Sequence, residues 1–140
     1  PVAGKRVFYT APGRQLVAAR PNNGTADNYA ADFTAGSGTQ TRYERIAAID
    51  ATNYYNDWKE REAKLLSFST APLDGVLEIA GHPVVSLWLS SSEPDAAIFA
   101  YLSEVEADGN VRYVVEGVLR AIHRAEAPAP PTRRLPCAMA

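Results

Sequence analysis

The sequence predicts an all-β fold, a sandwich or barrel of antiparallel strands. Short runs of aliphatic and aromatic residues fill 76–80, 84–90, 97–105 and 111–123. Gly, Pro, Asp and Asn separate these runs at a spacing of roughly ten residues, which is typical of successive strands joined by turns. We therefore take 72–123 as the part of the chain around which the rest is organised.

Two of these runs predict where strands lie in a sheet and where they bend. In the segment 84–90, alternate side chains put Leu87 on one face and Trp88 on the other, so both faces carry bulk. This pattern favours a strand in the middle of a sheet. The run 111–123 is long for one strand, and Gly117 inside it indicates a bulge or a bend.

The chain divides into three predicted regions. Residues 1–64 are a strand-poor lead-in or connector that opens with a hairpin, because strand-like segments at 5–10 and 15–19 flank a Pro-Gly turn signal. Within this connector, 56–64 is compatible with a short helix. Residues 65–124 hold the strands of the β-sandwich, the first of which is predicted at 64–70. Residues 125–140 are a Pro/Ala-rich extended tail.

Composition excludes several classes of protein. A hydrophobic content of 46% and a charged content of 21% are ordinary for a globular domain. The net charge of −2 argues against nucleic acid as a partner, since phosphate binding favours a basic surface. No apolar run approaches the roughly 18 residues of a membrane span. The single cysteine, Cys137, is compatible with a cytoplasmic location but leaves the compartment unknown.

Catalytic motifs are absent from the sequence. An α/β-hydrolase needs a Gly-x-Ser-x-Gly elbow between a strand and a helix, whereas Gly36-Ser37-Gly38 lies in a polar loop with the wrong spacing. His82 and His123 each flank a predicted strand, where a structural or surface histidine is the favoured interpretation over a member of a triad. We therefore predict no catalytic residue.

The sequence also predicts no metal and no cofactor. Cys pairs, His-x-His and His-Glu-x-x-His are missing, as are the phosphate-binding glycine motifs. Asp95, Glu104, Glu106 and Asp108 could supply oxygen ligands to calcium, but solvated turns are the favoured interpretation.

Aromatic side chains offer one weak candidate for a binding site. Trp58 and Trp88 are the candidate ligand or interface aromatics, because some β-sandwich modules bind carbohydrate on exposed rings. Aromatic residues at strand spacing more often lie in the core.

The order of motifs between residues 65 and 124 resembles a known family. The run 66–73, the run 77–84, the segment 94–102, the Asp108-Gly109 turn and the run 116–124 follow one another as in the C-terminal domain of Xaa-Pro dipeptidyl-peptidases. The same domain occurs in the cocaine-esterase-like (CocE/NonD) acyl hydrolases. The upstream segments 29–34 and 41–43 are similar to the connector of that family, so the resemblance covers about residues 14–136.

The resemblance implies a fold and a partner. In that family the domain is a jelly-roll β-sandwich, similar to galactose-binding modules, and it packs on an α/β-hydrolase domain that carries the Ser-His-Asp triad. There it helps to form the wall of the substrate pocket and often shapes an oligomer interface. The triad lies upstream of this domain, so the resemblance assigns no catalytic residue to this chain.

One departure from the family pattern leads to a further expectation. In the family the sandwich continues well past the segment 119–124, whereas this sequence ends at Ala140. We therefore expect a sandwich that is incomplete at its C-terminal end, with the missing strands supplied by another chain, by a second copy or by a rearranged pairing. Of these, a homo-oligomer formed through unpaired strands is the favoured expectation.

Three functions follow from these observations. The first is an accessory, non-catalytic domain or fragment of a serine hydrolase of the Xaa-Pro dipeptidyl-peptidase or acyl esterase type. The second is a free-standing module that binds carbohydrate or another small ligand. The third is a purely structural oligomerisation domain, which the sequence barely separates from the first.

Overall fold

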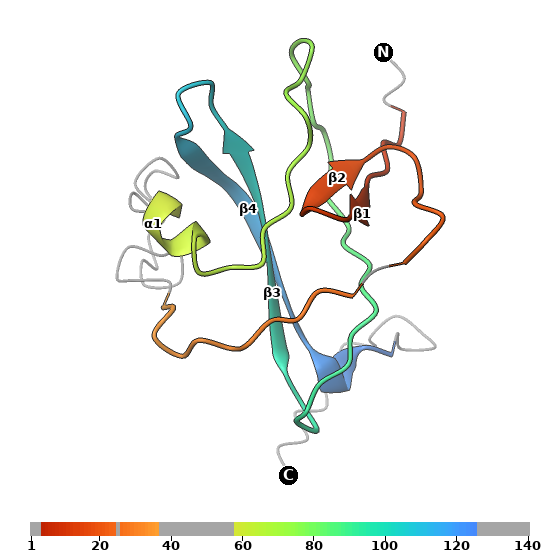
Figure 1. The fold of residues 1–140 in the computed structure, drawn as a ribbon, viewed down its shortest axis with the longest axis vertical. Helices are drawn as coiled ribbons and strands as arrows, with labels where there is room; N and C mark the ends of the chain where they lie inside the picture. The colour runs from red at the N-terminus through yellow and green to blue at the C-terminus, as the bar shows by residue number, and fades with distance from the viewer. Residues whose placement is uncertain (1–3, 25, 37–57, 126–140) are drawn as a thin grey trace, which may run out of the picture. The chain divides into compact units, whose positions relative to one another are not determined.

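The computed structural model describes residues 4–24, 26–36 and 58–125. They form two compact units, one of Pro1–Pro83 with Glu104–Tyr113 and the other of Val84–Ser103 with Val114–Ala140. The regular elements are β1 (Tyr9–Ala11), β2 (Gln15–Val17), α1 (Trp58–Glu62), β3 (Ala97–Val105), β4 (Val111–Arg120) and the 3₁₀ turn η2 (Ala121–His123) (Figure 1). No helix in the described ranges is long and apolar enough to cross a membrane.

The N-terminal hairpin is short and turns sharply. β1 and β2 pair antiparallel, with Tyr9 opposite Val17 and Ala11 opposite Gln15. Gly13 has a φ of 75° and Arg14 a φ of 58°, so two successive residues take left-handed backbone conformations. Glycine adopts this conformation freely, whereas an L-residue with a side chain pays roughly 1–2 kcal/mol. The hairpin predicted within the lead-in is present, with each strand shortened to three residues.

The strand predicted at 64–70 is reduced to a single point of pairing. Ser69 forms a parallel bridge with Gln15. The N–H of Leu16 donates to the Ser69 carbonyl at 2.7 Å, and the N–H of Ser69 donates to the Arg14 carbonyl at 3.0 Å. The segment therefore joins the β1–β2 hairpin at this residue, and the prediction of a full strand is wrong.

The predicted strands at 76–80 and 84–90 are not formed either. These residues run without assigned secondary structure, apart from a bend at Gly81, whose φ is 106°. A strand is defined by the ladder to its neighbour, and no ladder to this segment exists within the described residues. Instead of lying in the middle of a sheet, Trp88 is fully exposed at 104%.

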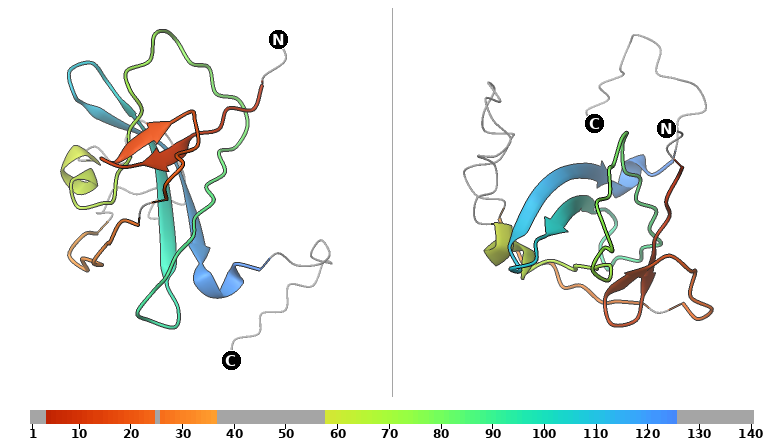
Figure 2. Two further views of the ribbon diagram at one scale, coloured as in Figure 1. Left: turned by 45° about the vertical axis from the view of Figure 1, so that its right-hand side comes forward. Right: turned by 90° about the horizontal axis from the view of Figure 1, so that it is seen from above.

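β3 and β4 form the longest paired element, a curved hairpin (Figure 2). At its turn, the N–H of Gly109 donates to the Glu106 carbonyl at 2.9 Å and the N–H of Glu106 donates to the Asn110 carbonyl at 2.8 Å. Gly109 has a φ of 79°, the conformation that a three-residue hairpin loop requires at this position. The predicted turn at Asp108-Gly109-Asn110 is confirmed.

The register of this hairpin changes along its length. At the end away from the turn, the N–H of Ala121 donates to the Ala96 carbonyl at 2.7 Å. Glu106 lies ten positions after Ala96 in the chain, whereas Ala121 lies eleven positions after Asn110. Since such bonds join residues that are directly opposite, the stretch from Asn110 to Ala121 contains one residue more than the stretch opposite it, which indicates a bulge between these two points. The alternation of side-chain burial in β4 breaks around Glu116, next to the glycine for which a bulge or bend was predicted.

The core of the described chain is small. Trp58, the first residue of α1, is the single apolar side chain in the described ranges that is buried, with 3% of its surface exposed. Its ring meets the Tyr113 ring edge-on, with centroids 6.0 Å apart and planes at 67°. This geometry is favoured by the ring quadrupoles and adds about 0.5–1.5 kcal/mol to the burial of area. The five-residue helix lies within the predicted 56–64, and packing on β4 supports it, because a helix this short is unstable alone.

Candidate functional site

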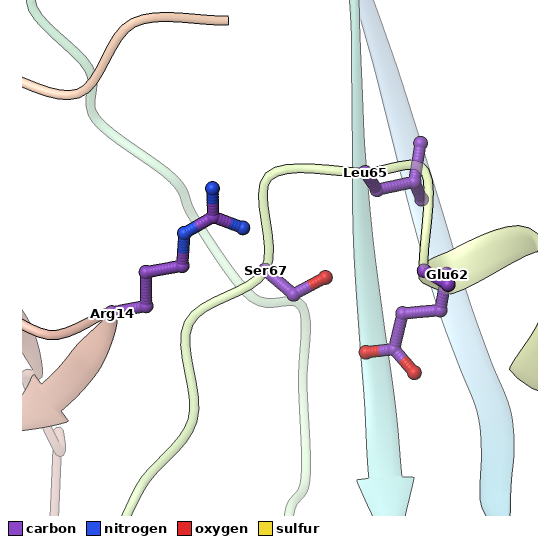
Figure 3. Close-up of a pocket in the computed structure, with 5 residues that line it drawn as sticks. Arg14, Glu62, Leu65 and Ser67 are labelled. Atoms are coloured by element: carbon purple, nitrogen blue, oxygen red, sulfur yellow. The ribbon is translucent and has the colours of Figure 1, made fainter.

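An open hollow lies beside α1 (Figure 3). Its volume is about 330 Å³, and Arg14, Glu62, Ala63, Leu65 and Ser67 line it. The charged groups of Arg14 and Glu62 come from the hairpin and from the last residue of α1, with Ser67 between them in Figure 3. Together they give the hollow one cation, one anion, one hydroxyl and an aliphatic patch.

The single parallel bridge to Ser69 creates this hollow. It holds the turn containing Arg14 against 64–70, although about fifty residues separate the two segments in the chain. None of these five residues was predicted from the sequence, because no local motif connects them. The one available signal in the sequence was Pro12-Gly13, which predicts a tight turn that continues into a strand.

A second cluster forms around Asp32, on a turn close to α1. The Asp32 carboxylate accepts a hydrogen bond from the Thr34 hydroxyl at 2.6 Å and from the Thr34 N–H at 2.8 Å. Lys64 approaches the same carboxylate at 4.0 Å and donates to the Thr34 hydroxyl at 3.3 Å. The side-chain hydrogen bond of Thr34, followed by its backbone N–H, holds the pKa of Asp32 below its usual 3.8.

A third cluster closes the end of the β3–β4 hairpin. Arg120 Nε donates to Asp95 Oδ2 at 2.5 Å, and the N–H of Ile122 donates to Asp95 Oδ1 at 3.3 Å. Partial burial raises the pKa of Asp95, but the hydrogen bonds from Arg120, Ala96 and Ile122 together hold it below its usual 3.8. Asp95 and Arg120 both belong to motifs on which the sequence resemblance rests. Their pairing gives those motifs a structural role.

Two of the four acidic residues considered for calcium, Glu106 and Asp108, make contacts at the β3–β4 turn. Asp108 accepts a hydrogen bond from the N–H of Asn110 at 2.8 Å, and Glu106 pairs with Arg112 at 2.5 Å. No group of three or more His, Cys, Asp or Glu side chains is arranged to hold a metal within 4–24, 26–36 and 58–125.

The comparisons with known proteins decide the family. The chain matches the X-Pro dipeptidyl-peptidase C-terminal non-catalytic domain over residues 3–135. This chain belongs to that family. The resemblance inferred from the ordered motifs is thereby confirmed, and the chain is an accessory, non-catalytic domain.

Two curated relatives extend this result. Proteins of Mycobacterium bovis and Mycobacterium tuberculosis, both named "Putative serine esterase", are each 41% identical to the domain over 135 residues. The alignment covers 96% of this chain but 22% of either relative, so the chain spans about a fifth of their length. No solved structure matches the chain.

The two histidines that were weighed as parts of a catalytic triad do not line the hollow. His82 and His123 are exposed, and neither makes a hydrogen bond or an ion pair to another described residue. Gly36 lies at the end of a described range, and the rest of the Gly36-Ser37-Gly38 run lies outside the described residues. Ser67, in the hollow, has an arginine and a glutamate as its ionisable neighbours there.

The two tryptophans of the domain have opposite environments. Trp58 is buried against Tyr113, which makes it a core residue of its unit. Trp88 is fully exposed, so its ring is accessible to a partner. The role of either residue in ligand binding or at an interface stays a prediction.

Proposed function

We propose that this non-catalytic domain is a β-sandwich that packs on an α/β-hydrolase catalytic domain and supports its substrate pocket and its assembly. The parent protein would be a serine hydrolase of the Xaa-Pro dipeptidyl-peptidase or acyl esterase type. The observation that carries the proposal is the family match over residues 3–135 to a domain described as non-catalytic. The relatives named as serine esterases, which are much longer than this chain, support the same parent.

The exposed apolar side chains of the domain support a docking role. Val76 and Trp88 are exposed at 103% and 104%, and further large apolar residues of the same stretch of sequence are more than half exposed: Ile79, Val84, Val85, Leu87 and Leu89. Burying a side chain of this size stabilises a protein by about 1.5–3 kcal/mol. Soluble monomers seldom leave so many large apolar residues of one segment exposed to water. Such residues therefore mark a contact with another domain or protein.

The fold of the complete domain is part of the proposal. A jelly-roll β-sandwich, similar to galactose-binding modules, would give the segment 76–90 the strand neighbours that its sequence pattern requires. Leu87 and Trp88 project to opposite faces in an extended chain, so both faces of that strand would be covered. Pairing of this segment with strands of a second copy would equally give a homo-oligomer.

The proposed function is tested in the polypeptide that contains this domain. A fluorophosphonate probe should label the catalytic part and leave the 140-residue chain unlabelled, because the serine nucleophile belongs to the catalytic domain. Deleting the domain should retain labelling but raise KM for an Xaa-Pro amide or a p-nitrophenyl ester, and it should lower the melting temperature. Labelling of the 140-residue chain itself would contradict the proposal.

Assembly is tested separately by sedimentation. We expect the 140-residue chain to shift to a larger species as its concentration rises, through the unpaired segment 76–90. A species that stays monomeric at every concentration, with a cooperative melt, would contradict the oligomer and leave the accessory role unaffected.

A further inference from the structure

The turn at Asp32–Ala35 is unusually well held for a surface loop. The N–H of Ala35 donates to the Asp32 carbonyl at 2.9 Å, and the N–H of Gly36 donates to the Thr34 carbonyl at 3.0 Å. The Asp32 side chain adds the two hydrogen bonds from Thr34, at 2.6 and 2.8 Å. Aspartate at the first position of a turn often bonds in this way to the residue two positions on, and it fixes the backbone of the residue between.

Contacts from α1 and the residues after it tie this turn to the body of its unit. Lys64 contacts both Asp32 and Thr34, and the Arg61 guanidinium donates to the Gly36 carbonyl. The hydroxyl of Tyr29 donates to the Lys64 carbonyl at 3.4 Å on the approach to the turn. The C-terminal end of the segment 26–36 therefore lies close to α1, as Figures 1 and 2 both show.

Phe33 occupies the tip of this fixed turn and is 98% exposed. The other apolar residues with comparable exposure, such as Val76 and Trp88, lie in unpaired extended chain. Ordering a flexible side chain or segment on binding costs free energy, and a turn that is already fixed avoids most of that cost. The backbone that carries the Phe33 ring is thus fixed, and aromatic side chains are enriched at protein interfaces.

We propose that Phe33 is an anchor that inserts into an apolar pocket on the catalytic domain of the same polypeptide. This inference rests on the proposed function, since it names the residue through which the two domains dock. One phenylalanine buries about 150–250 Å², whereas a stable complex of separate proteins needs about 1,200 Å². A tethered domain is present at an effective concentration of the order of millimolar, so a small anchor suffices there. The relatives, of which this chain spans 22%, supply the length for such a domain.

Three variants test the anchor in the full-length polypeptide that contains the domain. Phe33→Ser removes the ring, Phe33→Leu keeps most of its apolar area, and Asp32→Ala loosens the turn while leaving the ring in place. The measurement is the equilibrium unfolding of the full-length protein. We expect Phe33→Ser to shift its equilibrium constant by tenfold to about a hundredfold toward unfolding, with smaller shifts for Asp32→Ala and for Phe33→Leu.

The same variants in the 140-residue chain separate docking from folding. Because Phe33 is exposed there, Phe33→Ser should leave the circular dichroism and the melting curve of this chain unchanged. An equal loss of stability in both proteins would show that Phe33 contacts its own domain, which overturns the anchor. No loss in the full-length protein overturns it as well.

Two further measurements show whether the proposed function or the assignment of the Phe33 pocket is wrong. If a fluorophosphonate probe labels no part of the full-length polypeptide, the proposed function fails, whatever the effect of Phe33→Ser. If labelling is present and Phe33→Ser converts a sedimenting dimer to a monomer, the pocket belongs to a second copy, and the assignment to the catalytic domain is wrong.

Discussion

The β3–β4 hairpin and the segment 72–96 have similar sequence patterns but different structures. Both alternate bulky apolar side chains with smaller or polar ones, and both contain Gly and Asp at their turns. The hairpin forms nine- and ten-residue strands, whereas 72–96 forms no strand among the described residues. The difference lies in the distance to a partner. The partner of β3 begins after only five intervening residues, whereas 72–96 has no neighbouring strand supplied by the local sequence.

This comparison shows what a strand-like pattern can specify. Alternation determines which side chains share a face, but the ladder of hydrogen bonds needs a second strand in register. A tight turn with glycine at a left-handed position brings that second strand close at little entropic cost. The predictions that follow test whether pairing, and not the pattern itself, separates the two regions.

The largest expected effect contrasts the two tryptophans. Trp58→Ala in α1 should destabilise the 140-residue chain by about 3–5 kcal/mol, since it removes a buried ring and its edge contact with Tyr113. Trp88→Ala in the unpaired segment should change its stability by less than about 0.5 kcal/mol, because the ring is fully exposed. Urea unfolding followed by circular dichroism measures both. Equal losses for the two variants would show that 84–90 is packed in solution, which would contradict the comparison.

That pair of residues also shows how far the sequence could predict the site. Trp58 and Trp88 are equivalent by residue type, so the sequence proposed both as candidates. The burial of Trp58 depends on its contact with Tyr113, which lies more than fifty residues away in the chain. The hollow around Arg14 depends likewise on one bridge to Ser69, and no pattern within either segment encodes that pairing.

Local features were more predictable. The turn at Asp108-Gly109-Asn110 was read correctly, because its residues carry their own conformational preferences. The family followed from the order of several short motifs, including those that contain Asp95 and Arg120. The strands at 76–80 and 84–90 were predicted from pattern alone, and their pairing requires contacts that the described residues do not supply.

A second prediction compares two glycines with positive φ. Gly109→Ala should destabilise the hairpin by about 1–2 kcal/mol, because a side chain strains the left-handed conformation that the paired strands impose. Gly81→Ala should cost less, since no ladder holds the backbone of 72–96 in place and the segment can adjust its conformation. Neither added methyl group meets an atom within 4 Å, so the cost is one of backbone conformation.

Matched unfolding curves of the two glycine variants measure this difference. Gly117→Ala serves as a control, because its added methyl group also meets open space and its φ is not positive. A loss for Gly81→Ala as large as that for Gly109→Ala would show that 72–96 is held rigidly. The contrast between a paired and an unpaired region would then be wrong.

The smallest expected effect concerns the ion pair that closes the hairpin. Asp95 has a pKa below 3.8 in the folded protein because Arg120 and the N–H of Ile122 stabilise its carboxylate. A group with a lowered folded pKa contributes stability above its unfolded pKa and loses it as the pH falls through the folded pKa. The contribution of Asp95 should therefore be complete at neutral pH and decline below about pH 3.8.

The measurement is the stability of the wild type and of Asp95→Asn as a function of pH. The difference between them should be largest above the unfolded pKa and disappear in acid, and added salt should reduce it because the Arg120 side chain is exposed to solvent. Asp74→Asn, at an exposed position in the 72–96 segment, is the matched control for the loss of one surface carboxylate. A difference for Asp95→Asn that persists unchanged in acid would mean that its carboxylate charge does not hold the hairpin closed. The closure would then depend on the backbone bond from Ala121 to Ala96, which does not titrate.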